Sequence, residues 1–162
     1  MRFLVQPAPD ALDRARPPVR AFLAFAALLV VAAVAHRAAQ GGLSPAELER
    51  LLEPAPGERL GPLALWEEVH QGAFVYGFLL LTLGSLLAVC PVAPALRSGL
   101  LAVGTAAALT DLLAPFLPLA VPGFPGWAAL RIGAFLVAAA ALLASTALAW
   151  ATFGRPARRG DG

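Results

Sequence analysis

Several residue types are rare or missing in this chain of 162 residues, and each absence removes a class of protein. Charged residues make up 14% of the chain and hydrophobic residues 59%, whereas soluble domains carry about 25% charged residues. The single cysteine, Cys90, excludes an intrachain disulfide, a Cys-x-x-Cys redox centre and a thiolate metal cluster. Lysine and asparagine are missing and all 12 basic residues are arginine, which indicates GC-rich, bacterial coding. The composition predicts a protein whose solvent is lipid.

A basic surface for nucleic acid is also missing, although the net charge is +2. The arginines gather near the chain ends and no basic stripe follows any segment, so we predict no nucleic-acid partner. The chain has no phosphate-binding glycine loop and no paired nucleophile and base. We therefore expect no catalytic residues and do not predict an enzyme.

Long hydrophobic runs dominate what is present. A membrane-crossing helix needs about 20 mostly apolar residues, and four such runs occur, at about residues 21–39, 70–90, 97–119 and 128–152. They predict an all-α, polytopic membrane protein in which residues 21–152 form an antiparallel bundle of four transmembrane helices. Residues 1–20 are an N-terminal segment and residues 153–162 a tail.

The arginines predict the orientation, because cytoplasmic flanks of membrane helices carry an excess of basic residues. One side of the runs has only four arginines, which are Arg37, Arg50, Arg59 and Arg131. The other side has eight: Arg2, Arg14, Arg16, Arg20, Arg97, Arg155, Arg158 and Arg159. We therefore predict a multi-pass protein of the bacterial inner membrane with both termini in the cytoplasm and residues 40–69 as a periplasmic loop. The alternative is that the first run is a signal peptide, cleaved after Ala33-Val34-Ala35.

The predicted periplasmic loop contains a helix signal. Ser44-Pro45-Ala46-Glu47 provides an N-cap, a proline at the first helical position and a closing glutamate. Leu48, Leu51 and Leu52 follow on one helical face. We predict a short periplasmic amphipathic helix on the outer membrane surface. Its role is either functional, as a lid or as an element that docks a partner, or only structural, as a loop segment that buries its three leucines.

Small residues recur at helical spacing in three of the runs. They favour close helix packing in lipid, where the hydrophobic effect no longer drives association. The stripes are Ala73, Gly77, Gly84 and Ala88, then Gly104 and Ala108, then Ala134, Ala138, Ala141, Ser145 and Ala149. We expect each stripe to face the interior of the bundle.

Asp111 interrupts the third run, and a carboxylate at that depth costs at least about 2.5–3.5 kcal/mol on insertion scales. It shares a helical face with Gly104, Ala108 and Pro115, so we expect it to point inward. Pro115 cannot donate the helical hydrogen bond to the Asp111 carbonyl, and the register of an antiparallel hairpin places Tyr76 nearby. With no arginine expected at this level, the carboxyl is predicted to be neutral and hydrogen-bonded. The functional alternative makes Asp111, Tyr76 and Pro115 a proton relay or cavity.

A polar layer is predicted at the periplasmic ends of the first two membrane helices. It contains Glu67, Glu68 and His70 together with His36 and Arg37, whose guanidinium is expected to extend to the headgroups. Glu67 and His70 have the Glu-x-x-His spacing of di-iron bundles, but the other ligands of such a site are missing. We therefore predict no cofactor and no metal. The alternatives are haem b ligated by His36 and His70, or copper or zinc held by these groups.

Two motifs carry a resemblance to a known group of proteins. The segments at residues 67–74, 83–85 and 109–116 are similar to small four-helix bacterial inner-membrane proteins with no assigned activity. The resemblance spans residues 42–150 and includes His70 at the start of the second helix and Asp111-x-x-x-Pro115 in the third. Two further histidines of that pattern are replaced here by Gly72 and Ser85. If those histidines bind haem or a metal in relatives, the resemblance implies that most of the ligand set is lost.

These patterns together predict a non-catalytic accessory or anchoring subunit, which packs against itself or against a larger membrane complex. Two alternatives stay open. One is a haem- or quinone-associated redox subunit that uses His36 and His70. The other is a proton-coupled transport component that uses Asp111.

Overall fold

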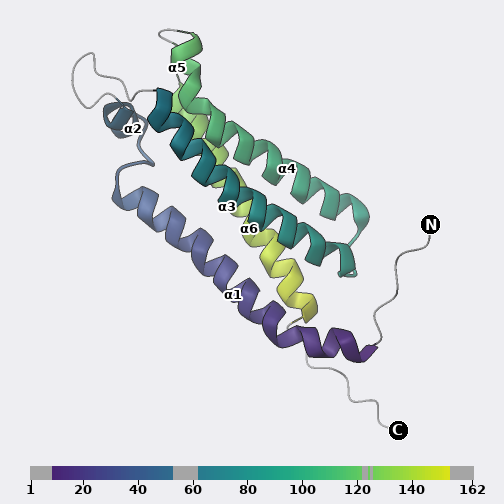
Figure 1. Ribbon diagram of the computed structural model, residues 1–162. Helices are drawn as coiled ribbons and strands as arrows, with labels where there is room; N and C mark the ends of the chain where they lie inside the picture. Colours follow the sequence, from purple (N-terminus) through teal and green to yellow (C-terminus); the bar gives the residue numbers. More distant parts are fainter. Residues whose placement is uncertain (1–8, 53–61, 122–123, 125, 154–162) are drawn as a thin grey trace.

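The computed structural model describes residues 9–52, 62–121, 124 and 126–153. In these residues the chain forms helices and no strands: α1 (Pro9–Ala39), α2 (Pro45–Leu52), α3 (Pro62–Val89), α4 (Pro94–Leu113), the 3-10 turn η1 (Ala114–Phe116), α5 (Leu117–Ala120) and α6 (Trp127–Phe153) (Figure 1). Four segments are long and apolar enough to cross a membrane: Ala15–Ala39, Leu63–Val89, Pro94–Ala120 and Trp127–Phe153. The predicted fold class, an all-α polytopic bundle with four membrane helices, is confirmed.

The four long helices alternate in direction, which gives the bundle two ends (Figure 1). At the terminal end, where α1 begins and α6 ends, Arg20 Nε donates a hydrogen bond to the backbone oxygen of Phe153 at 2.8 Å. The loop end holds the end of α1, the start of α3, and α2, η1 and α5. Helix α6 is central, because it packs against α1, α3 and α4.

The core near the terminal end is apolar and is shared by three helices. Its buried side chains come from α1, α3 and α6: Leu23, Ala26, Val30, Leu79, Leu83, Leu87, Leu142 and Ala149. Phe22 of α1 also meets Phe78 of α3 edge to face, with ring centroids 6.1 Å apart. Large side chains therefore fill the space between α1, α3 and α6.

The small-residue stripes of α4 and α6 are buried, as predicted. At Gly104 an added Cβ would lie 3.2 Å from Leu80 Cδ2 and 3.4 Å from Ala141 Cβ, so glycine lets α3, α4 and α6 approach closely. The prediction for α3 is wrong for three of its four stripe residues, which are exposed: Ala73, Gly77 and Ala88. The reason is that α3 buries leucines instead, because the space toward α1 and α6 needs larger side chains.

Helix α2 begins at Pro45, as the capping motif predicts, and the Leu48 amide donates to the Ser44 backbone oxygen at 2.9 Å. Leu48 is buried against Trp127 and Ala128 at the start of α6. The side chains of Leu51 and Leu52 lie outside the described residues. Leu48 thus anchors α2 to the loop end of α6.

Candidate functional site

Polar side chains from all four membrane helices meet around the carboxylate of Asp111, which is buried in α4 with 3% exposure. Arg37 of α1 donates from Nη1 to Oδ1 at 2.9 Å, and the Tyr76 hydroxyl of α3 donates to Oδ2 at 2.9 Å. Arg131 of α6 places Nε 3.5 Å from Oδ1. We call these residues, together with Glu68 of α3, the polar cluster.

Arg131 connects the buried carboxylate to the edge of the bundle. It is 4% exposed, and its Nη2 donates to Glu68 Oε1. The Glu68 side chain is 46% exposed, so the cluster reaches from the interior to the surface. Two arginines and two acids balance each other in charge, which offsets much of the cost of placing them in the bundle.

Local structure at the end of α1 places Arg37. Gly42 N donates to the Arg37 oxygen at 2.9 Å and Gly41 N to the Ala38 oxygen at 3.1 Å, which is the Schellman pattern of a helix end. Gly41 has a φ of 74°, which glycine adopts without strain. The Arg37 guanidinium also lies over the ring of Phe135, 4.0 Å from its centroid. The helix end and the α6 ring together turn Arg37 toward Asp111.

The backbone also breaks beside Asp111. Helix α4 ends at Leu113 and the chain continues as η1, which contains Pro115. Because Pro115 has no N–H, the Asp111 carbonyl lacks its helical donor four residues on. Both Pro115 and Asp111 are buried. The helix break and the acid therefore lie at one level of the bundle, as the sequence predicts.

Two expectations about charge at this level are wrong. We expected no arginine beside Asp111, yet Arg37 and Arg131 both lie there, so the premise for a neutral carboxyl does not hold. We also expected Arg37 to extend to the headgroups, but it turns inward to Asp111. The physical reason is that the last turn of α1 and the first turns of α6 lie close enough for long arginine side chains to reach the carboxylate. The inward direction of Asp111 and its contact with Tyr76 agree with the predicted hairpin register.

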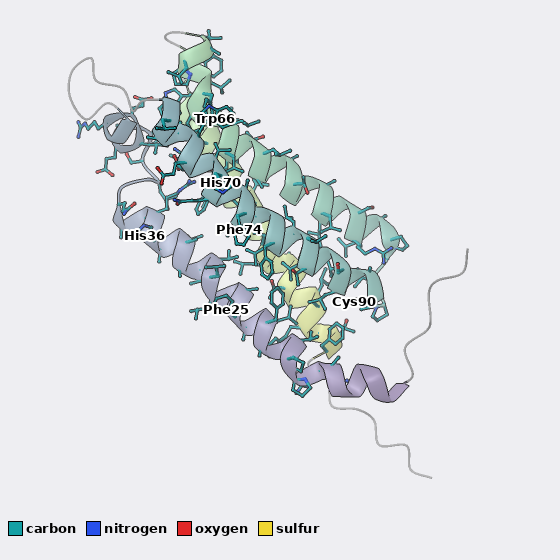
Figure 2. The ribbon with its side chains drawn as sticks, in the orientation of Figure 1. Phe25, His36, Trp66, His70, Phe74 and Cys90 are labelled. Atoms are coloured by element: carbon teal, nitrogen blue, oxygen red, sulfur yellow. The ribbon has the colours of Figure 1, made fainter. Side chains whose placement is uncertain are left out.

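The structure does not draw the predicted histidines into this cluster. His36 lies near the end of α1 and His70 on α3, and both are exposed, as is Glu67 (Figure 2). Within the described part of the chain, no group of three or more His, Cys, Asp or Glu side chains is placed to hold a metal ion. Haem ligation by the two histidines stays an untested prediction. Of the predicted outer layer, Arg37 and Glu68 are the two residues that join the cluster.

Sequence reasoning missed the role of Arg131, which it used only to set orientation. Two signals were available. Arg131 is the one charged residue of α6, and it lies three residues before Ala134, the first member of the buried stripe. A charge on the same face as a packing stripe indicates burial against a partner. Phe135, on that face, was missed as the ring beneath Arg37.

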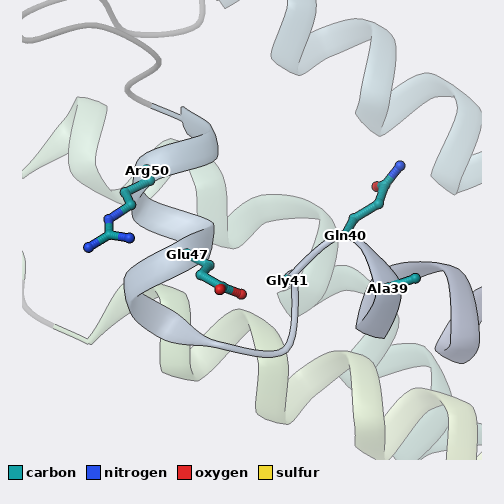
Figure 3. A pocket seen from close by; sticks show the side chains of 5 residues that line it. All are labelled: Ala39, Gln40, Gly41, Glu47 and Arg50. Atoms are coloured by element: carbon teal, nitrogen blue, oxygen red, sulfur yellow. The ribbon is translucent and has the colours of Figure 1, made fainter.

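Hollows also lie outside the polar cluster, and two of them are lined by residues that the structure describes. One, of about 400 Å³ beside α2, is lined by Ala39, Gln40, Gly41, Glu47 and Arg50 (Figure 3). The other is a groove of about 550 Å³ between α4 and α6, lined mostly by apolar residues that include Val103, Ala107, Gly133 and Ala134. Neither includes a residue predicted from the sequence as a site.

The fold and the cluster define a class: a multi-pass helical membrane protein whose four spanning helices meet at one ion-paired carboxylate. A family model described as a transmembrane helical domain matches residues 58–159, which is more than half of the chain. The chain therefore belongs to this family of transmembrane helical domains. Comparisons with curated proteins and with solved structures gave no match. The family match agrees with the coarser part of the predicted resemblance, and the histidine and Asp-x-x-x-Pro motifs stay predictions.

Proposed function

We propose that the chain is a non-catalytic accessory or anchoring subunit that packs beside other helices in the membrane. One observation carries the proposal: the buried carboxylate of Asp111 pairs with Arg37 of α1 at 2.9 Å, and Arg131 of α6 lies 3.5 Å from the same oxygen, so charged groups of three helices meet inside the bundle. In lipid, such contacts hold helices together where the hydrophobic effect does not. Charges paired in this way favour a role in assembly.

The exposed faces of α1 and α3 supply a surface for a partner. Phe25 of α1 is 61% exposed and Phe74 of α3 is 75% exposed (Figure 2). Small residues on the outward side of α3, Ala73 and Gly77 among them, let a neighbouring helix approach closely. An added Cβ at Gly77 would meet no atom within 4 Å, so this position is open in the isolated chain.

We further propose that the subunit lies in the bacterial inner membrane with both termini in the cytoplasm. The excess of arginine on one side of the spans supports this orientation. The bond from Arg20 to Phe153 supports a common side for both ends of the chain, because it joins the start of the bundle to its last helix.

The test is recovery of the tagged full chain, expressed at its native level, from its own membranes in a mild detergent. We expect a membrane partner, or a second copy, to be recovered in a fixed ratio. Gly77→Leu should abolish that recovery, whereas Gly99→Leu on α4, which also has no neighbour within 4 Å of an added Cβ, should preserve it. A monodisperse monomer without any partner would contradict the proposal.

The same preparation separates the proposal from the two alternatives drawn from the sequence. A Soret band that shifts on reduction and is lost in His70→Ala would favour the redox subunit. Proton flux into proteoliposomes that is lost in Asp111→Asn, at a temperature where this variant stays folded, would favour the transport component. The accessory role predicts neither signal.

A further inference from the structure

One buried donor of the polar cluster has no hydrogen-bond partner. Arg131 Nε is buried and unbonded among the described residues, and Asp111 Oδ1 lies 3.5 Å away from it. That oxygen already accepts a hydrogen bond from Arg37 Nη1 at 2.9 Å. Two arginines therefore face one carboxylate oxygen, and only Arg37 is at hydrogen-bond distance. A buried N–H without a partner is costly, so the arrangement favours any change that lets Arg131 close the gap.

Arg37 is the member of the pair that is able to leave. Its side chain is 20% exposed and lies in the last turn of α1 at the loop end, whereas that of Arg131 is 5% exposed. If Arg37 swings outward, Arg131 Nε is already beside the carboxylate, 3.5 Å from Oδ1, and needs only a short movement to bond it. Asp111 then keeps a cationic partner in addition to the hydroxyl of Tyr76.

The outward position of Arg37 calls for an anion of matching shape. A guanidinium presents parallel N–H donors that fit the oxygens of a phosphate group, and it is more weakly hydrated than an ammonium. The headgroups of anionic lipids offer such phosphate groups at a membrane surface. If Arg37 binds such a phosphate group and Arg131 takes its place on Asp111, the carboxylate keeps a cation and each arginine keeps an anion.

We propose that Arg37 forms an anion site at the loop end that binds a phosphate group, while Arg131 replaces it on Asp111. The phosphate comes either from the headgroup of an anionic lipid or from free inorganic phosphate. The site involves the same Arg37–Asp111 contact that supports the accessory role, but it needs no partner protein, so lipid binding tests it separately from the recovery of a partner.

The first test measures lipid binding to the full chain in a neutral detergent by native mass spectrometry. Phosphatidylglycerol is the anionic probe and phosphatidylcholine the zwitterionic control. We expect phosphatidylglycerol to bind more tightly, and Arg37→Gln to weaken its binding about tenfold, since it removes charge-assisted hydrogen bonds. Arg50→Gln, which removes an exposed arginine from α2 at the same end, should leave the affinity unchanged.

A second pair of variants keeps the test decisive if Arg37→Gln folds poorly. Glu68→Gln removes the charge that pairs with Nη2 of Arg131 and weakens that contact, so Arg131 becomes freer to bond Asp111, and phosphatidylglycerol should bind more tightly. Glu67→Gln removes the same charge from the exposed neighbouring position and should have a clearly smaller effect.

Each outcome decides the proposal. Saturable binding of inorganic phosphate with the same dependence on Arg37 supports the site and assigns it to the free ion. The proposal would be overturned if Arg37→Gln and Arg50→Gln lowered the affinity for phosphatidylglycerol equally. It would also be overturned if Glu68→Gln and Glu67→Gln raised that affinity equally. Equal affinity for both lipids, with no binding of inorganic phosphate, would overturn it as well.

Discussion

Asp111→Asn keeps the shape of the side chain but removes the charge that two arginines face, and we expect it to lower the free energy of unfolding substantially. Asp111 Oδ1 is 2.9 Å from Arg37 Nη1 and 3.5 Å from Arg131 Nε. Removing one partner of a buried ion pair costs about 3–5 kcal/mol, because the other charge is left uncompensated.

The structure places the expected loss near the lower end of that range. Arg131 keeps its ion pair with Glu68, and Arg37, at 20% exposure, is able to turn toward the surface. The Tyr76 hydrogen bond is partly kept by the asparagine oxygen, and such bonds in membrane bundles contribute about 0.6 kcal/mol on average. We therefore expect a loss of about 3 kcal/mol.

The assay is unfolding in mixed micelles by increasing dodecyl sulfate, followed by circular dichroism and by tryptophan fluorescence. Thr110→Val is the matched control, because the Thr110 hydroxyl donates to the Ala106 oxygen of its own helix at 2.8 Å and does not contact Asp111. The control should change stability by less than about 0.5 kcal/mol. If Asp111→Asn were no more destabilising than Thr110→Val, the reasoning about the cluster would be refuted.

Three further substitutions and one control test the packing, the end of α1 and the Tyr76 hydrogen bond with the same assay. Gly104→Val should cost about 1–3 kcal/mol by overpacking against α3 and α6, whereas Gly99→Val, with no atom within 4 Å of an added Cβ, should be tolerated; equal effects would contradict the packing account. Gly41→Ala should cost about 1–2 kcal/mol, because φ is 74° there, and an unchanged stability would contradict the assigned helix end. Tyr76→Phe should lower the free energy of unfolding by about 0.6–1.7 kcal/mol, because it removes the hydrogen bond to Asp111. A loss larger than that of Asp111→Asn would contradict the conclusion that the ion pairs of Asp111 contribute more than this hydrogen bond.

The fold was predictable because every membrane helix is a long apolar run bounded by proline, glycine or charge. The sequence also predicts the inward face of Asp111, since Gly104, Ala108 and Pro115 share it, and all four residues are buried. The face of α3 was harder to predict. Small residues favour close approach, but leucines on the neighbouring face of α3 fill a wider space, and only the tertiary arrangement decides which face is buried.

The composition of the polar cluster was only partly predictable. Counting along each helix assigned Arg37 and Arg131 to the membrane surface, where arginine is common beside a span. Which way a long, flexible side chain turns depends on what the neighbouring helices offer. Here Asp111 and Phe135 offer an anion and an aromatic face to Arg37, and neither is visible from the sequence around it. Pairings between residues 74 positions apart in the chain need the fold.

The central claim is that Arg37 and Asp111 form an ion pair inside the bundle, which holds α1 in place together with its apolar core contacts. A double-mutant cycle with Arg37→Gln, Asp111→Asn and the double variant measures this interaction most directly, with the free energy of unfolding in mixed micelles as the readout. The contact at 2.9 Å predicts a coupling energy of about 1–3 kcal/mol between the two sites. Additive effects, with a coupling energy below about 0.5 kcal/mol, would contradict the account.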